Sequence, residues 1–309
     1  MSSIRSRMFQ FALRNRNLLQ FKLKLKPEIT ADTDIVALRA KTEKPTSLFG
    51  KLPEGLKIRQ AEIPGIYAEY LSPETPQPGK IVMYFHGGGY VLGSAQSHRI
   101  HVSKVVSGTN ITALTFNYGL APEDPFPKGL NDAMEVYKHL LNNGYRGEDI
   151  AFMGDSAGGG LALSTLNKLK DEKSELPACV VALSPWTDLK NTGESLTSNE
   201  DVDYLTWRES WTVFSDYYRK DEDAENPYIS PLYGELSGLP PMQIFVGSDE
   251  LLRDDSIRYA EKAKSAGVDV NLTIGEGLFH CYPVCSPIFP EATSAMKQLC
   301  DFIKNHLLK

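Results

Sequence analysis

The stretch Gly154-Asp-Ser-Ala-Gly-Gly159 constrains the fold more than any other part of the chain. An apolar run (150–153) precedes it and an apolar run rich in small residues (161–164) follows, which predicts a strand, a sharp turn and a helix. A serine in such a turn is held at strained backbone angles with its hydroxyl exposed, as in a nucleophile elbow. Glycines flank it because strand and helix come too close for a Cβ. The pattern alone also fits a glycine-rich turn that holds phosphate.

Length and charge exclude several classes of protein. The 309 residues suffice for one large α/β domain with a sizeable core. A net charge of −6 argues against a nucleic-acid partner. No apolar run approaches the roughly 20 residues that cross a bilayer, so we expect no stable membrane insertion.

The cysteines do not form a metal-binding pattern. They are Cys179, Cys281, Cys285 and Cys300, and no Cys-x-x-Cys pair occurs among them. Cys281 and Cys285 lie four residues apart, but no second ligand pair lies nearby to complete a zinc site. The spacing favours buried thiols in a reducing cytoplasm.

The first 26 residues differ in charge from the rest. They contain seven basic and no acidic residues, whereas the remaining chain has 26 basic and 39 acidic ones. This contrast favours a basic amphipathic helix that lies over an acidic body. A transit peptide or a membrane-surface helix would also fit the charge. Residues 27–56 are polar, rich in Pro and Gly, and predicted to connect this segment to the body.

Buried strands alternate with helices along the rest of the chain, which predicts a mainly parallel sheet with helices on both faces. The elbow strand and helix occupy 150–170. Further strands are expected at 58–63, 66–71, 81–85, 112–118, 178–183, 242–246 and 268–274, of which the first two form a hairpin. Further helices are expected at 98–107, in a segment that ends at about 141, at 255–266 and at 290–307. Residues 190–230 interrupt this rhythm with two expected helices and no strand, and we expect an inserted lid there.

A serine hydroxyl needs a base, and the base needs an orienting carboxylate. His280 is the histidine that falls in a loop just after the last expected strand, and Asp249 follows the preceding strand. The carboxyl ends of parallel strands share one edge, so Ser156, Asp249 and His280 are expected to meet there as nucleophile, acid and base. Asp254 and Asp255 are rival acids, although Asp255 is better placed as a helix N-cap.

Three consecutive glycines follow the buried strand 81–85, after His86. Such a run is costly in chain entropy, which indicates backbone N–H groups that point into a site. Acyl transfer passes through an oxyanion that needs preorganised donors. The N–H groups of Gly87, Gly88 and Ala157 are predicted to form this oxyanion hole.

Together these residues resemble the hormone-sensitive-lipase-like family of serine esterases, which are α/β-hydrolases with a His-Gly-Gly-Gly loop. The matching pieces span about residues 80–285: His86-Gly-Gly-Gly89, Tyr118-x-Leu-Ala-Pro-Glu123, Gly154-Asp-Ser-Ala-Gly-Gly159, Ser184-Pro-Trp-x-Asp188, Asp249-x-Leu-x-Arg-Asp254 and Gly277-x-x-His280. Two positions depart from the family pattern: Gly119 stands where arginine is usual, and Glu250 is taken to replace the common proline after the acid.

The resemblance implies an α/β-hydrolase fold with a helical cap. Residues 1–45 would form an N-terminal cap segment, 46–309 the catalytic domain, and 190–228 the inserted cap helices. It further implies a carboxylic ester hydrolase that uses Ser156, His280 and Asp249 and needs no metal or cofactor. A homodimer is also consistent with the family. Glu123 and Asp155 match the motifs as structural residues.

The expected substrates are small-molecule esters with short- to medium-chain acyl groups. An amidase or peptidase could use the same triad, and a non-catalytic small-molecule receptor could use the same scaffold. A receptor has no need to keep serine, histidine and acid together, so the sequence favours the esterase.

Overall fold

The computed structural model describes residues 2–15, 29–30, 32–43 and 51–308. In this part of the chain the strands form one eight-stranded sheet in the order β1-β2-β4-β3-β5-β6-β7-β8. β1 pairs antiparallel with β2, β2 pairs antiparallel with β4, and the other neighbours are parallel. The strands are β1 (Lys57–Ile63), β2 (Ile66–Ser72), β3 (Ile81–Phe85), β4 (Thr112–Phe116), β5 (Ile150–Asp155), β6 (Cys179–Leu183), β7 (Met242–Gly247) and β8 (Val270–Gly275).

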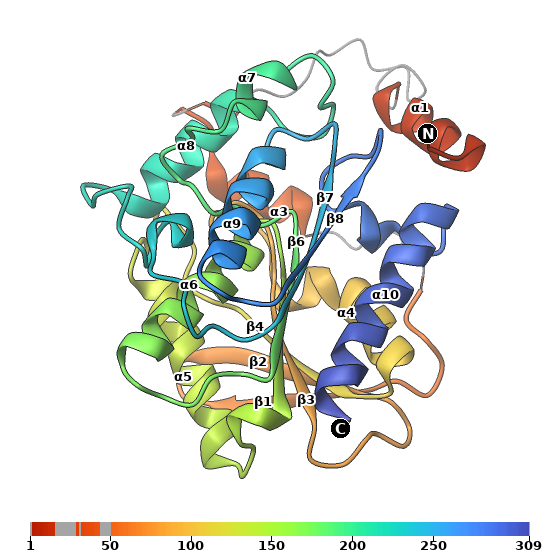
Figure 1. Ribbon diagram of the computed structural model, residues 1–309, viewed down its shortest axis with the longest axis vertical. Coiled ribbons are helices and arrows are strands. Elements are labelled where there is room, and N and C mark those ends of the chain that lie inside the picture. Colours follow the sequence, from red (N-terminus) through yellow and green to blue (C-terminus); the bar gives the residue numbers. More distant parts are fainter. Residues whose placement is uncertain (1, 16–28, 31, 44–50, 309) are drawn as a thin grey trace.

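Helices cover both faces of the sheet. Figure 1 shows α4 and α10 on one face and α5, α6 and α9 on the other. The described helices are α1 (Ile4–Arg14), α3 (Ile35–Thr42), α4 (Ala95–Thr109), α5 (Lys128–Asn142), α6 (Ala157–Asp171), α7 (Ser195–Ser198), α8 (Arg208–Arg219), α9 (Arg253–Ser265) and α10 (Pro290–Leu307). The predicted α/β architecture, the hairpin and the edge strand at 268–274 are therefore confirmed.

The strands form because their sequences are continuous apolar runs. Every residue of β3, β5, β6 and β7 is buried, as expected for central strands covered on both faces. The outer strand β8 is buried only at its ends, Val270 and Gly275, and is partly or fully exposed between them. The register pairs Phe85 with Gly154 and Asp155 with Leu183, which brings the carboxyl ends of β3, β5 and β6 level with one another.

The insertion predicted at 190–230 contains α7 and α8 and no strand among its described residues. Both helices lie between β6 and β7 in the sequence and gather at one end of the sheet (Figure 1). Asn199 follows α7 and donates to the carbonyls of Ser248 and Glu250, each at 2.9 Å. The insertion therefore holds the loop that follows β7.

The basic N-terminal segment begins as a helix, α1, which packs beside α10. The Phe9 ring lies 6.0 Å from that of Phe279 and 5.7 Å from that of Phe289, measured between centroids. The Ser3 hydroxyl donates to Glu291 at 2.8 Å. The rest of the predicted helix falls on residues 16–28, outside the described residues. No described helix is long and apolar enough to cross a membrane.

One predicted cap is wrong. Helix α9 begins at Arg253, so Asp255 lies inside its first turn and is not the N-cap. Its buried carboxyl oxygen Oδ2 instead accepts the backbone N–H groups of Thr187 and Asp188, both at 2.8 Å. Burial and the nearby Asp188 raise the pKa of Asp255 to about 8. Asp255 therefore fixes the loop after β6 rather than the end of a helix.

A substitution at Gly158 tests how closely α6 packs on the sheet. A Cβ there would lie 2.2 Å from the Phe85 carbonyl oxygen and 2.4 Å from that of His86. Gly158→Ala should therefore lower the free energy of unfolding by at least about 2 kcal/mol, because two backbone segments must move. Urea unfolding followed by circular dichroism measures this loss.

Gly238→Ala is the matched control. A Cβ at Gly238 meets nothing within 4 Å, although its φ of +73° disfavours alanine. The control should lose only about 1 kcal/mol, from backbone strain. Equal losses in the two variants would contradict the packing argument.

Candidate active site

Ser156 lies in the sharp turn between β5 and α6. Its φ of 55° and ψ of −124° are strained for a residue with a side chain. The turn is held at both ends, because the Ser156 N–H donates to the Leu183 carbonyl at 2.8 Å and the Ser156 carbonyl accepts from Trp186 N–H at 3.1 Å. The predicted elbow is therefore present, with Ala157 as the first residue of α6.

Glycine is required at Gly154 and at Gly160, which directly follows the motif, because the backbone around Ser156 leaves no room for a side chain. A Cβ on Gly154 would lie 2.4 Å from the Gly158 carbonyl oxygen, and one on Gly160 would lie 2.2 Å from that of Trp186. Strand, helix and the loop after β6 thus meet at backbone contact around Ser156. These backbone contacts fix the position of Ser156.

The acid that contacts His280 is Glu250. Its Oε2 lies 2.5 Å from His280 Nδ1, and its side chain is fully buried. Glu250 Oε1 accepts from the Ser184 hydroxyl at 2.8 Å and from the Gly247 N–H at 2.5 Å. Ser184 Oγ also accepts the N–H of Cys281, the residue after His280, at 2.9 Å. Both oxygens of Glu250 are therefore fixed.

The prediction that Asp249 orients the histidine is wrong. Asp249 Oδ1 accepts from its neighbour Ser248 at 2.7 Å, and its N–H donates to the Leu278 carbonyl at 3.0 Å. The turn after β7 aims the next side chain, Glu250, at His280. Asp254, the rival acid, accepts the Ser195 N–H at 2.8 Å and so holds α7.

The surroundings of His280 favour its charged form. Burial by itself lowers the pKa of His280, but the adjacent Cys281 sulfur and the Glu250 carboxylate outweigh burial and raise that pKa well above its usual value. Burial raises the pKa of the Cys281 thiol, which keeps it protonated near neutral pH. We therefore attribute the basicity of His280 chiefly to Glu250.

The glycine loop after β3 turns its second and third glycines toward the serine. Gly88 and Gly89 line a cavity together with Ser156 and His280. The Gly87 N–H instead donates to Asp155 Oδ1 at 3.1 Å. The prediction that Gly87 supplies an oxyanion donor is therefore corrected: Gly87 anchors the loop, while Gly88 and Gly89 are the loop residues at the cavity.

Asp155 links the elbow to this loop. Besides Gly87, its Oδ1 accepts from the Tyr84 hydroxyl at 2.8 Å, and its Oδ2 lies 3.6 Å from His98 Nε2. His98 Nδ1 lies 3.0 Å from the Ser94 carbonyl, to which it can only donate, so a neutral ring would turn a lone pair toward the carboxylate. Both ring nitrogens are suitably placed when His98 is protonated.

The pKa values agree with an ion pair. Burial alone lowers the pKa of His98, but Asp155 overcomes this and raises it. Burial alone raises the pKa of Asp155, but His98 and the Tyr84 hydroxyl hold it well below its usual value. The neighbouring His86 and His101 stay neutral, because burial lowers the pKa of each to about 3.

The cavity that contains Ser156 has a volume of about 440 Å³. Besides the residues above, it is lined by large apolar side chains from α3, from α8 and from the segments before each: Ile29, Leu38, Leu205, Trp207, Trp211 and Phe214. Such a lining suits the apolar part of a small molecule, with polar atoms confined to the serine end.

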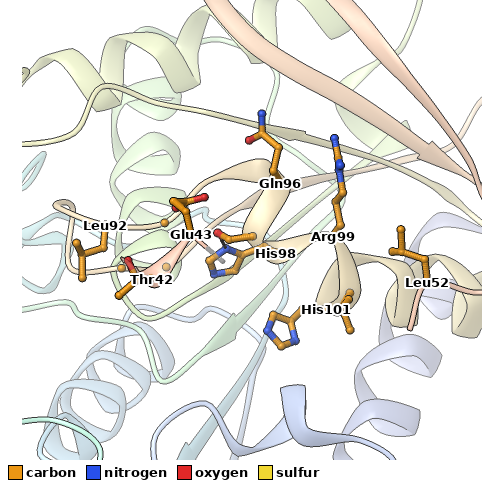
Figure 2. A pocket seen from close by; sticks show the side chains of 13 residues that line it. Thr42, Glu43, Leu52, Leu92, Gln96, His98, Arg99 and His101 are labelled. Carbon is orange, nitrogen blue, oxygen red and sulfur yellow. Dashed lines mark hydrogen bonds between the residues drawn. The ribbon is translucent and has the colours of Figure 1, made fainter. Parts of the chain in front are cut away.

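A second cavity of about 480 Å³ lies on the other side of the glycine loop. It shares Thr42, Gly88 and Leu92 with the first but contains neither Ser156 nor His280. Figure 2 shows Glu43 from the end of α3 beside His98 on α4. Because the second cavity lacks Ser156 and His280, the first cavity is the candidate active site.

Within the described ranges no three His, Cys, Asp or Glu side chains form a group that could hold a metal ion. Sequence reasoning missed Glu250, Gly89 and Ser184 as site residues. Each lies next to a residue or inside a motif that the sequence did single out. The sequence therefore located the right segments but did not show which residue of each turn faces the site.

The Asp155–His98 pair predicts a pH-dependent contribution to stability. The raised pKa of His98 gives stability that is present below its unfolded pKa of about 6.5 and is lost as pH rises through the folded value. The lowered pKa of Asp155 gives stability that is present above about pH 3.9 and is lost in stronger acid. The pair is therefore most stabilising in mildly acidic solution.

We expect Asp155→Asn to lower the free energy of unfolding by about 3 kcal/mol at pH 6 and by clearly less at pH 9, where His98 loses its charge. Urea unfolding at the two pH values measures the difference. In a His98→Gln background the penalty of Asp155→Asn should no longer depend on pH. An equal penalty at both pH values in the otherwise unchanged protein would contradict the ion pair.

The chain is similar to several known proteins. Residues 82–284 match a family model described as an α/β-hydrolase fold. The chain is 33% identical to an esterase of Acinetobacter venetianus over 86% of this chain and 88% of that one, and 36% identical to an acetyl-hydrolase of Streptomyces hygroscopicus over 77% and 79%. A solved esterase of the bacterial hormone-sensitive lipase family superposes with a TM-score of 0.88 at 33% identity, covering 99% of both chains. The chain therefore belongs to the α/β-hydrolase family, in its hormone-sensitive-lipase-like group of esterases.

Proposed function

We propose that the protein hydrolyses small carboxylic esters through an acyl-enzyme on Ser156, with His280 as base and Glu250 as the carboxylate that orients it. The observation that carries this proposal is the cavity that Ser156 and His280 share, with the buried Glu250 at 2.5 Å behind the histidine. A strained serine, a histidine and a fully buried acid serve no evident packing need together.

The reaction proceeds in two halves. His280 accepts the Ser156 proton through Nε2 as the hydroxyl oxygen attacks the ester carbonyl, while Glu250 stabilises the resulting imidazolium through Nδ1. The oxyanion is held by the N–H groups of Gly88, Gly89 and Ala157, the last with the positive end of the α6 dipole. His280 protonates the leaving alcohol and then activates the water that releases the acid.

The substrate preference follows from the apolar walls of the cavity. With a volume of about 440 Å³ and aromatic side chains from the insertion, it suits short- to medium-chain acyl groups better than long ones. We propose that residues 1–45 and the helices of 190–228 act as the cap over this cavity, with 46–309 as the catalytic domain. Leu38 of α3 and Trp211 of α8 both line it, in keeping with this division.

The proposal extends to location and assembly. All four cysteines are free and buried, which is in keeping with the reducing cytoplasm expected from the sequence. A homodimer stays a prediction from the family resemblance.

The first test measures initial rates on p-nitrophenyl esters from acetate to laurate. We expect activity that peaks at short to medium acyl chains and falls at least about 10⁴-fold in Ser156→Ala, because the nucleophile is lost. Full activity in that variant would contradict the mechanism. Faster cleavage of matched anilides than of esters would favour an amidase, and a folded protein inactive on both would favour a receptor.

The second test separates the two candidate acids. Glu250→Gln should lower kcat by about 10²–10⁴-fold, because the imidazolium loses its counter-charge. Since Glu250 raises the pKa of His280 and the base acts only when neutral, its removal should also move the acidic limb of the pH–rate profile to lower pH.

Asp249→Asn is the matched control, because Asp249 contacts Ser248 and not His280. Its kcat should stay within about threefold of the unchanged protein, as is usual for a residue outside the reacting groups. A larger loss in Asp249→Asn than in Glu250→Gln would restore the acid expected from the sequence.

A further inference from the structure

Helix α8 presents one aromatic face to the catalytic residues. Trp211, Phe214 and Tyr218 are spaced so that they share a face of the helix, and all three are buried. The Trp211 ring lies 5.8 Å from the His280 ring in an edge-on arrangement. The other two rings lie against the glycine loop.

Three consecutive residues of the glycine loop have positive φ, and the strain falls on Tyr90, which is not a glycine. Gly88, Gly89 and Tyr90 have φ values of 123°, 63° and 62°. Tyrosine rarely adopts such a conformation, and its cost must be met by the surrounding structure. A loop under strain relaxes when its contacts are removed, and the Gly88 and Gly89 N–H groups would then turn away from the cavity.

Two side chains of α8 hold this conformation in place. A Cβ on Gly89 would lie 2.3 Å from Phe214 Cδ2, so the Phe214 ring packs directly on the glycine backbone. The Tyr218 ring stacks on the Tyr90 ring with centroids 3.9 Å apart and an angle of 12° between the planes. On the far side, the Tyr90 carbonyl accepts from the Ala121 N–H at 2.9 Å.

We propose that Phe214 and Tyr218 are positioning residues, through which helix α8 holds the Gly88–Gly89 backbone in the conformation that binds the oxyanion. This inference rests on the proposed function. It makes α8 part of the catalytic apparatus as well as a wall of the cavity. Loosening α8 then weakens transition-state stabilisation, so kcat falls while KM for a small substrate stays nearly constant.

Tyr218 gives the cleaner test. It acts on the loop through Tyr90 and does not line the cavity with Ser156, whereas Phe214 does. Tyr218→Leu removes the stacked ring. Tyr218→Phe keeps the ring and removes only a buried hydroxyl that has no hydrogen-bond partner among the described residues.

With p-nitrophenyl acetate, we expect Tyr218→Leu to lower kcat about tenfold, less than the loss of a whole oxyanion donor, and to change KM less than about twofold. Tyr218→Phe should restore kcat to within about twofold of the unchanged protein. A rise in KM at unchanged kcat would overturn the proposal, as would the same kcat loss in both variants.

Inhibition by phenylboronic acid reports on the oxyanion directly, because the boronate forms a tetrahedral anion on a catalytic serine. Its Ki should rise in Tyr218→Leu by the factor by which kcat falls. An unchanged Ki would overturn the proposal. Circular dichroism and the thermal midpoint of each variant show whether a loss reflects unfolding instead.

The strain itself is tested with Tyr90→Gly, since glycine adopts the φ of 62° at little cost. In that background, Tyr218→Leu should lower kcat by less than about twofold, because ring contact and strain are already gone. Additive losses would overturn the route through Tyr90. If ester cleavage requires Ser156 but Tyr218→Leu is fully active, this inference alone is wrong. If the unchanged protein cleaves no ester, the proposed function is wrong as well.

Discussion

The buried carboxylate of Asp155 joins the parts on which the site depends. It ends β5 directly before Ser156, holds the Gly87 N–H of the glycine loop at 3.1 Å and faces His98 of α4 at 3.6 Å. A buried charge is tolerated only where partners satisfy it, so strand, loop and helix must keep their relative positions for the carboxylate to remain ionised. Ser156 and the glycine loop are thus linked by the one side chain that lies between them in these contacts.

The fold was largely predictable because its central strands are continuous apolar runs separated by helices. Such runs reveal β3, β5, β6 and β7 without knowledge of their neighbours. The start of α9 was less accessible, since Asp255 resembles a capping residue locally. Its actual partners, Thr187 and Asp188, lie more than 60 residues earlier in the chain. Local sequence patterns predicted the helices and strands, whereas contacts with distant segments determine the hydrogen-bond partners of the polar residues at their ends.

The same limit explains the errors in the site. The sequence singled out Ser156 and His280, which line one cavity, because a strained turn and a loop histidine leave a clear local pattern. The acid was placed one residue too early, on Asp249 instead of Glu250, because the turn after β7 decides which side chain faces His280. The glycines that line the cavity were also placed one residue too early, because nothing in three consecutive glycines shows that Gly87 is held by Asp155. Single-residue register in a turn depends on hydrogen bonds to other segments.

Two supports of different chemistry meet at the glycine loop. On one side the ionised Asp155 holds Gly87, and on the other the rings of Phe214 and Tyr218 press on Gly89 and Tyr90. The electrostatic support changes with pH, because it depends on the charge of His98, whereas the aromatic support does not. In alkaline solution Asp155 therefore loses its charged partner, while α8 still holds the loop in its strained conformation. For the proposed mechanism such redundancy is useful, because a small rotation of either peptide would turn its N–H away from the position of the oxyanion.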